Sequence, residues 1–337
     1  MNNPLVSVIM PAYNCAAFVQ EAVDSICGQS LTDWELIILD DKSTDDTLQV
    51  LRSIRDPRIR VVESERNEGQ AHQMNKGIAL ATGQYVAIAH SDDINAPDRL
   101  QRQVALFESN AALGVVGSWI RYIGDRKGIE EYPVGSDNCF VMMIDDSPFA
   151  HPTVMFRKSL LDSLGTIYRQ DFVPAEDYEL WARLSTHTKF DNVPLPLVNY
   201  RVHASQISQR KQTELQHKIK TIKALFLDKN FGSLTERQRA ALDALLSIEP
   251  GCSLNPDYVR ATEWLPKELG RISHTDPKRW RLRLSRMLFK GLTITSRYQW
   301  GTGLFFFLHY PYFAFNRRRH TAHIVYRSLN PIKGPAK

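Results

Sequence analysis

Adjacent carboxylates occur at two points of the sequence where an apolar run has just ended. Asp40 and Asp41 follow the run WELIIL, and Asp92 and Asp93 follow the run YVAIAHS. Carboxylates at the end of a buried strand can hold a hard divalent cation and join it to phosphate oxygens. The alternative is that Asp92 or Asp93 caps the loop and the helix near Pro97, and the pair alone does not decide between the two.

Two further acidic positions could have a chemical role or a purely structural one. Asp40 could accept a hydrogen bond from a ring N–H of a nucleobase, or it could be a turn residue in the segment DDKSTDDT. Glu176 and Asp177 would lie in the first turn of a helix, where the helix dipole stabilises a carboxylate by about 0.3–1 kcal/mol. Since each structural role suffices by itself, a function depends on the whole set of polar positions.

Apolar runs alternate with segments of helical spacing in the N-terminal part of the chain. Strands are expected at residues 5–10, 34–39, 59–63 and 85–89, and helices at residues 17–27, 43–54 and 69–81. This alternation predicts βαβ units, a mostly parallel sheet and the α/β class. Ligands of open α/β sheets bind at the carboxyl ends of the strands, so we expect Tyr13, Asn14 and the acidic pairs to share one edge.

Helix signals continue after the acidic pairs, and the chain reads as helices with loops past residue 210. Pro97 and Pro174 each fit the first turn of a helix. Ser233 with Glu236 fits a capping box for a helix that would continue to residue 246. We expect a domain boundary near residues 203–212, with domains at residues 1–205 and 206–337.

The composition is that of a folded globular protein. With 43% hydrophobic and 23% charged residues, it excludes collagen-like, coiled-coil and low-complexity chains. The 4 cysteines are scattered without CxxC spacing, so neither a zinc cage nor a disulfide framework is expected. The first 30 residues lack the pattern of a signal peptide, which makes a reducing cytoplasm the expected compartment.

Charge is divided unevenly along the chain. Residues 1–210 carry 19 Lys and Arg against 28 Asp and Glu, whereas residues 211–337 carry 23 against 9. After Asp276 there are 13 Lys or Arg and no acidic residue. The C-terminal part should therefore be attracted to acidic lipid or to nucleic acid. The absence of a zinc-finger or RNP-like signature disfavours nucleic acid.

The C-terminal segment combines basic and aromatic residues. Asp276 and Pro277 predict the start of a helix that has basic residues on one face and apolar residues, such as Trp280, on the other. A 16-residue aromatic run follows at residues 300–315, and then Arg317–Arg319. The run is shorter than the roughly 20 residues of a spanning helix, so we interpret it as lying in a membrane interface. The alternative is that it packs on the N-terminal domain or on a second subunit.

Eight segments with polar motifs occur in a fixed order along the first 205 residues. They are VSVIMPAYN (6–14), LDDKSTDDT (39–47), NEGQAHQMNKG (67–77), ATGQYVAIAHSDD (81–93), PDRL (97–100), HPTVMFR (151–157), EDYELWARL (176–184) and YRVH (200–203). The order and content resemble the inverting glycosyltransferases of family 2, which have the GT-A fold, a Rossmann-like nucleotide-binding sheet flanked by helices. The glycine fingerprints of dinucleotide and P-loop sites are absent.

The resemblance implies a nucleoside-diphosphate sugar donor, most commonly a UDP-sugar, an Mg²⁺ or Mn²⁺ ion, and an acceptor hydroxyl on a saccharide or lipid-linked saccharide. The family's nucleotide-binding positions correspond to Pro11, Ala12, Tyr13, Asn14, Asp40, Asn67, Gly69, Asn75 and Asp92. Its metal and diphosphate positions correspond to Asp92, Asp93 and His203, although His203 could also be a solvated loop histidine. Asp177, with Glu176 beside it, matches the general base, and Phe149, His151 and Trp181 would line the acceptor site.

Two positions depart from the family pattern. His90 stands where many relatives have the first Asp of DxDD, so the preferred metal ion is left open. Met74 stands where relatives often have Arg, so the identity of the nucleobase is left open as well. A nucleotidyltransferase is the alternative enzyme, although its usual GxGxR-like loop is missing, and a non-catalytic membrane-associated scaffold is the alternative of another class. The family and the basic extension together predict an enzyme of bacterial surface-polysaccharide synthesis, peripheral on the inner face of the cytoplasmic membrane, with no nucleic-acid partner.

Overall fold

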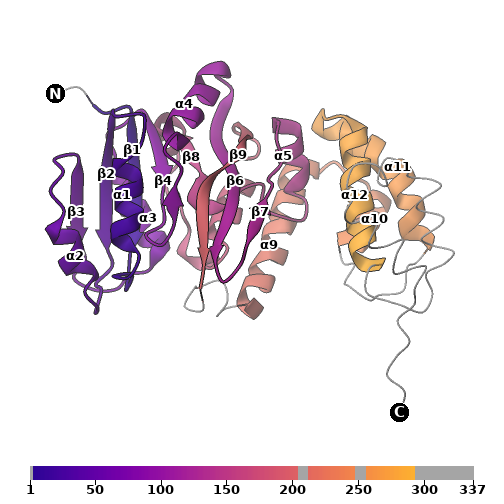
Figure 1. The fold of residues 1–337 in the computed structure, drawn as a ribbon. Helices are drawn as coiled ribbons and strands as arrows, with labels where there is room; N and C mark the ends of the chain where they lie inside the picture. Colours follow the sequence, from indigo (N-terminus) through magenta and orange to yellow (C-terminus); the bar gives the residue numbers. More distant parts are fainter. Residues whose placement is uncertain (1–2, 204–211, 247–255, 293–337) are drawn as a thin grey trace, which may run out of the picture. The chain divides into compact units, whose positions relative to one another are not determined.

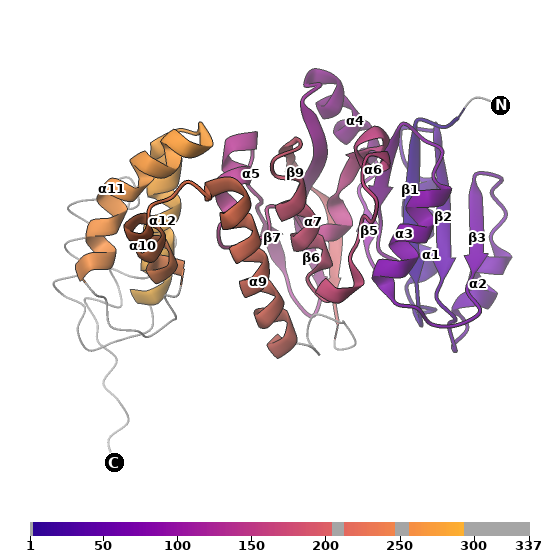
Figure 2. The same ribbon diagram turned by 180° about the vertical axis from the view of Figure 1, so that it is seen from behind.

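The computed structural model describes residues 3–203, 212–246 and 256–292. The chain divides into two compact units, residues 1–232 and 233–337. The first unit has a sheet flanked by helices, and the described part of the second is helical (Figures 1 and 2). Helix α9 (Gln212–Phe231) is grouped with the first unit and packs on α7 (Glu176–Leu184), whereas the boundary expected from the sequence precedes α9.

A nine-stranded sheet lies at the centre of the first unit, counted over the described residues. Its order is β3-β2-β1-β4-β8-β6-β9-β5, with β7 paired to β6 (Figure 1). The strands are β1 (Val6–Ala12), β2 (Trp34–Asp40), β3 (Ile59–Glu63), β4 (Tyr85–Ile88), β5 (Ile94–Asn95), β6 (Leu113–Gly124), β7 (Gly128–Glu130), β8 (Met155–Arg157) and β9 (Lys189–Val202). The pairs β3–β2, β2–β1, β1–β4 and β6–β9 are parallel and contain most of the paired residues. The predicted α/β class with a mostly parallel sheet is confirmed.

Both faces of the parallel half are covered by helices. Val8 and Met10 of β1 join the apolar cluster that α1 (Val19–Cys27) and α4 (Arg99–Ser109) complete. Ile9 points to the other face, toward α3 (Gln70–Leu80). A Cβ at Gly77 of α3 would lie 2.4 Å from Ile9 Cγ2, so this close approach of helix and strand requires glycine.

The predicted elements of the first 90 residues are present, with shifts at their ends. The largest shift is in α2 (Thr47–Ser53), which begins after the expected residue 43 because residues 43–46 form a loop instead. In that loop the Asp45 carboxylate accepts a hydrogen bond from the backbone N–H of Thr47 at 3.0 Å. Local hydrogen bonds of this kind compete with the helix for the same backbone groups.

The second half of the sheet is partly antiparallel and positions the later motifs. β8 is antiparallel to both β4 and β6, and β5 is antiparallel to β9. Pairing of Ile94 with Asn199 brings the end of β9 beside residues 90–93, the acidic segment that follows β4. The remaining elements of this half are α5 (Ser136–Met142), η1 (His151–Thr153), α6 (Lys158–Asp162) and η2 (Gln170–Phe172).

The described part of the second unit consists of α10 (Glu236–Leu246), α11 (Pro256–Ser273) and α12 (Pro277–Leu292). The capping box of α10 is formed by Thr235 and Gln238. The Gln238 N–H donates to Thr235 Oγ1 at 3.3 Å, and the Thr235 N–H donates to Gln238 Oε1 at 2.9 Å. The predicted box at Ser233 and Glu236 is therefore wrong, since a second pair with the same spacing satisfies the helix terminus.

Helix α12 begins where the sequence predicts it. The backbone N–H of Lys278 donates to Asp276 Oδ1 at 2.9 Å, which makes Asp276 the capping residue before Pro277. Trp280 is buried, and its Nε1 donates to Thr275 Oγ1 at 2.6 Å. The apolar face of this helix therefore packs within the second unit over its first turns.

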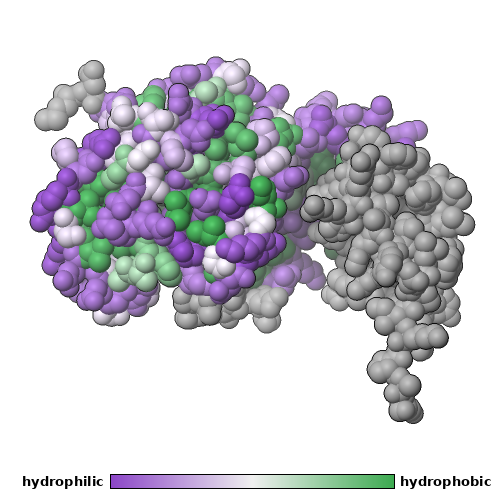
Figure 3. All heavy atoms as spheres, in the orientation of Figure 1, coloured by the Kyte–Doolittle hydropathy of each residue, from purple (hydrophilic) through white to green (hydrophobic). Residues whose placement is uncertain are grey.

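Within the described ranges, no helix is both long enough and apolar enough to cross a bilayer. The aromatic run at residues 300–315 and the arginines at 317–319 lie outside the described residues, as does Cys252. The other cysteines, Cys15, Cys27 and Cys139, are free thiols. On the face of the first unit seen in Figure 3, polar residues cover much of the surface, with smaller apolar patches between them.

Candidate active site

The carboxyl ends of β1, β2 and β4 share one edge of the sheet, because the three strands are parallel neighbours. Ala12 of β1 is in register with Asp40 of β2, and β4 pairs with the other side of β1. The loops after β1 and β2 are joined through Asn14, whose Oδ1 accepts the Thr44 N–H at 2.7 Å and whose own N–H donates to Ser43 Oγ at 3.1 Å. Asn14 has φ of 49°, a left-handed conformation that asparagine tolerates.

Asp40 presents a buried carboxylate at this edge. The residue is 2% exposed, and Oδ2 accepts the Ser43 N–H at 3.2 Å. Oδ1 has no hydrogen-bond partner among the described residues. A buried acceptor left unpaired costs about 1–3 kcal/mol, so a ligand N–H at this oxygen would be stabilising. Pro11 and Ala12 precede the strand end, and Tyr13, which follows it, is 49% exposed and offers an aromatic surface.

Asp41 has a structural task that sequence reasoning missed. Its buried carboxylate accepts the backbone N–H groups of Glu68 and Gly69, each at 2.9 Å, and the side-chain amide of Gln73 at 2.5 Å. Asp41 therefore caps α3 from the neighbouring strand, satisfying N–H groups at the positive end of the helix dipole. The only sequence signal was its place after a buried strand, because its partners lie about 30 residues further along.

The other positions of the α3 motif also serve the backbone. Asn67 Nδ2 donates to the Asp41 carbonyl at 3.2 Å. Gly69 has φ of 88°, a left-handed conformation that favours glycine before α3. Asn75 uses both of its amide atoms on Tyr168, donating to its carbonyl at 2.8 Å and accepting its N–H at 2.9 Å. Asn75 thus joins α3 to the segment after α6.

The acidic segment after β4 is held by the end of β9. Asp93 is 1% exposed, and its Oδ1 accepts the Arg201 N–H at 2.8 Å. The Arg201 Nε donates to the Asp92 carbonyl at 2.9 Å, and His203 Nε2 lies 3.0 Å from Asp92 Oδ2. Burial, followed by the neighbouring Asp92 carboxylate, raises the pKa of Asp93 well above its usual range. The three predicted metal positions, Asp92, Asp93 and His203, are therefore brought together.

Arg99, the arginine of the PDRL segment, is a buried residue that we did not single out from the sequence. Its guanidinium donates to Asn95 Oδ1 and, at 2.7 Å, to the Ile88 carbonyl. Burial lowers the pKa of Arg99 to about 9, although the Asp93 carboxylate favours the charged form. Arg99 stiffens the strand end from which the acidic segment leaves.

A chain of hydrogen-bonding groups runs from His90 into the protein. His90 Nε2 lies 3.1 Å from His151 Nδ1, and His151 Nε2 lies 2.9 Å from the Tyr168 hydroxyl. Burial lowers the pKa of each histidine to about 4, and for His90 the neighbouring His151 adds to this effect. Both imidazoles are therefore neutral at pH 7. His151 was expected at the acceptor site, and the structure gives it contacts to His90 and Tyr168.

Asp177 lies in the first turn of α7 and interacts electrostatically with the same group of residues. Burial raises its pKa, while the Tyr178 N–H, which donates to Asp177 Oδ1 at 2.7 Å, opposes the rise. The Asp177 carboxylate in turn favours the charged form of His90 and disfavours ionisation of Tyr168 and Tyr200. Asp177 is thus within electrostatic reach of the acidic segment, although far from it in sequence. Glu176 beside it is buried.

Phe149 and Trp181, which were expected to line an acceptor site, lie in the hydrophobic core. They are 2% and 0% exposed, and their rings pack edge to face with centroids 5.2 Å apart. Trp181 also stacks on Phe156 of β8. These side chains hold α7, and with it Asp177, against the sheet instead of presenting a surface to solvent.

The residues after β4 fit the coordination of a divalent cation. Ligand atoms of His90, Asp92 and Asp93 all lie within 4.8 Å of one another. Asp93 Oδ2 is buried and has no hydrogen-bond partner in the described ranges. An unpaired buried carboxylate oxygen is costly unless a cation or a donor completes it, so the chemistry of this donor set suits a metal ion.

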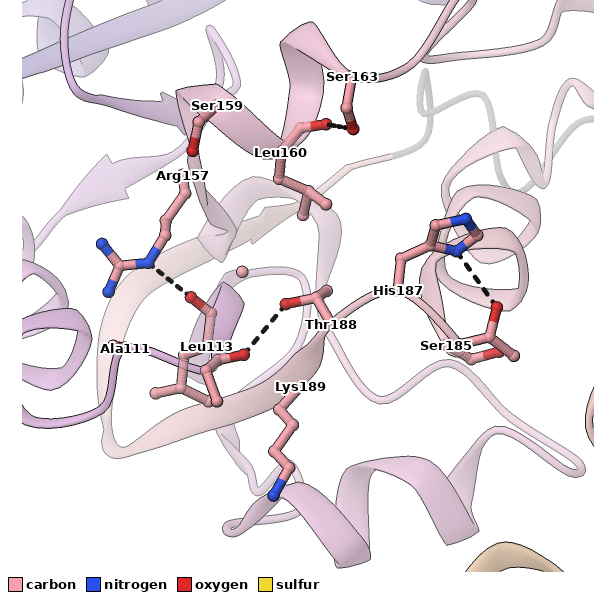
Figure 4. Close-up of a pocket in the computed structure, with 13 residues that line it drawn as sticks. Ala111, Leu113, Arg157, Ser159, Leu160, Ser163, Ser185, His187, Thr188 and Lys189 are labelled. Atoms are coloured by element: carbon pink, nitrogen blue, oxygen red, sulfur yellow. Dashed lines mark hydrogen bonds between the residues drawn. The ribbon is translucent and has the colours of Figure 1, made fainter.

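A separate pocket of 710 Å³ lies at the amino ends of β6 and β9 (Figure 4). Figure 4 shows the Arg157 Nε donating to the Leu113 carbonyl at 2.8 Å and the Thr188 hydroxyl directed at a backbone carbonyl of the same wall. His187 and Lys189 also line it. The lining residues include none of the site residues His90, Asp92, Asp93, Asp177 and His203, so this pocket is distinct from the candidate active site.

Comparison with known proteins identifies the family. Glycosyl transferase family 2 matches residues 7–165. An uncharacterized glycosyltransferase of Haemophilus influenzae is 32% identical over 236 residues, which cover 65% of this chain and 73% of the relative. A UDP-Glc:alpha-D-GlcNAc-diphosphoundecaprenol beta-1,3-glucosyltransferase of Escherichia coli is 30% identical over 226 residues, 66% of this chain and 86% of the relative.

A solved structure has the same fold. The crystal structure of S. aureus TarS 1-349 in complex with UDP-GlcNAc superimposes with a TM-score of 0.54 at 18% sequence identity, covering 84% of this chain and 91% of the other. This likeness supports the predicted GT-A fold. Together with the matching motifs and the relatives, it shows that this chain is a glycosyltransferase and belongs to glycosyl transferase family 2.

Proposed function

We propose that this protein is an inverting, metal-dependent glycosyltransferase that moves a sugar from a nucleoside-diphosphate sugar, most simply a UDP-sugar, to a hydroxyl of a saccharide or lipid-linked acceptor. The proposal is carried by the contact of His203 with Asp92, beside the buried Asp93, together with the electrostatic interaction of Asp177 with His90 of the same segment. These residues come from three separate motifs. Transfer from a sugar nucleotide needs two things in one place, a site that binds the diphosphate and a general base that takes the proton of the acceptor hydroxyl.

The nucleoside would bind at the ends of β1 and β2. Asp40 Oδ1, buried and without a partner among the described residues, would accept a ring N–H of the base. The exposed ring of Tyr13 would cover one face of the base or ribose. The walls of this pocket would be formed by Pro11, Ala12 and Asn14. The backbone around α3 would support the pocket, held in place by Asn67, Gly69 and Asn75.

The diphosphate would bind over the acidic segment. Asp92 and Asp93, with an adjacent imidazole of His90 or His203, would hold a divalent cation. Such an ion, when bound, neutralises charge on the diphosphate as it leaves. Asp93 is kept in place by the Arg201 N–H, and Arg99 holds the strand end beneath it.

Asp177 would act as the general base. It would take the proton of the acceptor hydroxyl while the acceptor oxygen bonds to the anomeric carbon and the bond from that carbon to the diphosphate oxygen breaks. One displacement from the face opposite the nucleotide inverts the anomeric centre. Burial raises the pKa of Asp177, which makes it a stronger base than an ordinary aspartate.

The alternatives have less support. A nucleotidyltransferase would need an anion-binding loop at the first strand end, where this chain has Pro11–Asn14. A non-catalytic scaffold would have no need of a base and acidic segment placed together. Residues 1–205 are accordingly proposed as the catalytic domain, with α9 packed against it.

We also propose a lipid-linked acceptor and a peripheral position at the inner face of the cytoplasmic membrane. The E. coli relative described above carries diphosphoundecaprenol in its name, and residues 211–337 hold 23 Lys and Arg against 9 Asp and Glu. A basic surface is attracted to acidic lipid. Cell fractionation with residues 277–337 present or deleted tests the idea, which fails if both forms remain in the soluble fraction.

The function itself is tested by a thermal-shift screen with UDP-, GDP- and dTDP-sugars, each with and without Mn²⁺ or Mg²⁺. A ligand at 100 times its Kd should stabilise the fold by about 2.7 kcal/mol, which is readily measured. We expect a shift with one class of sugar nucleotide that needs the cation. Release of the nucleoside diphosphate with a saccharide acceptor would then establish transfer, and no shift with any donor would contradict the proposal.

A further inference from the structure

In the group formed by His90, Asp92 and Asp93, His90 is the member whose side chain offers nitrogen, and its Nδ1 faces the buried carboxylate of Asp93. His90 Nδ1 and Asp93 Oδ2 are 3.9 Å apart, too far for a hydrogen bond. Two ligand atoms that each lie about 2.1 Å from one ion can be separated by up to roughly 4.2 Å. A single cation between these two atoms is therefore compatible with their spacing. A carboxylate oxygen of Asp92 lies within 4.8 Å of a ligand atom of each residue.

Asp93 adds an independent reason to expect a ligand here. The side chain is 1% exposed, and only Oδ1 is engaged, by the Arg201 N–H. Oδ2 has no hydrogen-bond partner in the part of the chain that the structure describes. The unpaired oxygen lies 3.9 Å from His90 Nδ1, and an ion between the two atoms would give it a partner.

The hydrogen-bond chain behind His90 is compatible with the tautomer that a ligand at Nδ1 requires. If His90 carries its proton on Nε2, it donates to His151 Nδ1 at 3.1 Å, and His151 then donates from Nε2 to the Tyr168 oxygen at 2.9 Å. The side-chain amide of Gln70 lies 3.5 Å from His90 Nε2, and with this tautomer the amide oxygen would face the Nε2–H. This arrangement leaves the lone pair of His90 Nδ1 free on the side of Asp93. Metal-binding histidines usually donate their second ring N–H to a buried partner in this way.

We propose that His90 Nδ1 is a direct ligand of the divalent cation, together with Asp92 and Asp93, and that this nitrogen makes the site favour transition-metal ions over Mg²⁺. Imidazole suits the later first-row metals, whereas carboxylate and water suit Mg²⁺. His151 is then a positioning residue that holds the ring of His90 and its tautomer. The inference deepens the proposed function, on which it rests for the role of the ion, but ion affinity can be measured separately.

The test uses the full chain and Co²⁺ as the probe, with Mg²⁺ as the competing ion. Calorimetry gives the affinities of wild type, His90→Asp and the control His187→Gln, which changes an exposed histidine in the separate pocket. In His90→Asp we expect the ratio of Co²⁺ to Mg²⁺ affinity to fall at least about tenfold, in line with the loss of a metal-binding group. The control should keep the wild-type ratio. An unchanged ratio in His90→Asp overturns the proposal.

The visible absorption of bound Co²⁺ reports nitrogen ligation directly. We expect its bands to move in His90→Asp and in His90→Gln, and to keep their positions in His151→Gln, where only affinity should fall because the ring of His90 loses its support. Thermal unfolding of each variant separates these effects from misfolding, and His90→Gln replaces His90→Asp if the latter does not fold. Wild-type bands in a folded His90→Gln protein would rule out ligation by His90.

The same samples separate this inference from the proposed function. The wild-type protein and each variant are also titrated with a UDP-sugar in the presence of Co²⁺. If Co²⁺ binds through His90 but no sugar nucleotide binds, the proposed function fails and the ligand role stands. If a sugar nucleotide binds and His90→Asp leaves the ion preference unchanged, the ligand role fails and the function stands. If Co²⁺ does not bind even with UDP added, the ligand role is wrong.

Discussion

His203 Nε2 and Asp92 Oδ2 lie 3.0 Å apart although 111 residues separate them in sequence. The pairing of β5 with β9 makes this contact, because it carries the end of β9 across the acidic segment. His203 also packs on Phe18 before α1, with ring centroids 5.3 Å apart. The acidic segment is therefore held by the last motif of the catalytic domain, which in turn packs on the segment before α1.

Replacing Asp92 with alanine should abolish cation-dependent binding of the donor. The change removes a ligand oxygen and leaves His203 without this carboxylate. Calorimetry with a UDP-sugar and Mn²⁺ should show at least about a 100-fold loss of affinity, because loss of a group that only supports a metal ligand already costs about 10–100-fold. Asp98→Ala is the matched control, since Asp98 is an aspartate of the next loop that pairs with Arg102. Retained cation dependence in Asp92→Ala would show that the ion binds elsewhere.

Changing Asp177 to asparagine should stop transfer while preserving donor affinity. The carboxylate that accepts the proton is lost, and the nucleotide pocket at β1 and β2 is untouched. General-base catalysis typically contributes about 10²–10⁴-fold, so kcat should fall by that factor with little change in the Kd of the donor. Asp171→Asn, an exposed aspartate before α7, should keep wild-type turnover. Undiminished kcat in Asp177→Asn would refute the role of base.

Asp40→Asn should weaken binding of the nucleoside. The unpaired Oδ1 would become part of an amide that lacks the carboxylate charge, so the hydrogen bond from the base loses strength. We expect a roughly tenfold loss of UDP affinity, equal to about 1.4 kcal/mol. Asp46→Asn, an exposed aspartate in the same DDKSTDDT segment, provides the comparison. Equal UDP affinity in the two variants would place the base away from Asp40.

Asp41→Ala should destabilise the first unit through α3. The backbone N–H groups of Glu68 and Gly69 and the amide of Gln73 would lose their acceptor. Unsatisfied buried donors cost about 1–3 kcal/mol, so the free energy of unfolding should fall by that amount. Urea unfolding followed by circular dichroism measures it. A change of less than about 0.5 kcal/mol, typical of surface positions, would argue against the cap.

Glu35 should make a pH-dependent contribution to stability at the amino end of the sheet. Burial alone would raise its pKa, but hydrogen bonds from the Ser7 hydroxyl at 2.6 Å and from the Thr82 hydroxyl at 2.7 Å leave the pKa of Glu35 below its usual range. A carboxylate with a lowered pKa in the folded state stabilises it above the unfolded pKa of about 4.3, and this contribution is lost as the pH falls.

The measurement compares wild type with Glu35→Gln by urea unfolding at several pH values. Near pH 7 the variant should be less stable by about 1.5–3 kcal/mol, the range of a hydrogen bond to a charged group. The difference should shrink as the pH falls below about 4. Glu65→Gln, an exposed glutamate, should show neither effect. A difference that is independent of pH would mean that the charge of Glu35 does not stabilise the fold.

Much of the N-terminal architecture could be predicted because local patterns report it. Alternation of apolar runs and helical spacing predicts β1 to β4 and their helices, and it predicts that Asp40 and Asp92 follow strands that are parallel neighbours. Asp276 before Pro277 predicts the start of α12 for the same reason, since a cap depends on residues close in sequence. Thr235 and Gln238 mark the limit of such local signals, because a second pair nearby had the same spacing.

Contacts between distant segments decided whether a side chain lies in the core or at the site, and which residues it contacts. From the sequence alone, Phe149, His151 and Trp181 were expected to line one acceptor site. The tertiary structure separates them, because β8 and α7 enclose Phe149 and Trp181 in the core, whereas His151 reaches His90 across η1. In the same way, the sequence shows that Asp41 is an acidic residue after a predicted strand. Its role as a cap of α3 could not be predicted, because it depends on α3 packing beside β2.

The sequence by itself determined the family, the order of the elements and the set of acidic strand ends, since these depend on residue type and local spacing. Only the tertiary structure decided that ligand atoms of His90, Asp92 and Asp93 lie together, that His203 contacts Asp92, and that Asp177 interacts electrostatically with His90. These relationships arise from strand pairing and helix packing between segments far apart in the chain, where burial removes water and makes each unpaired polar atom matter.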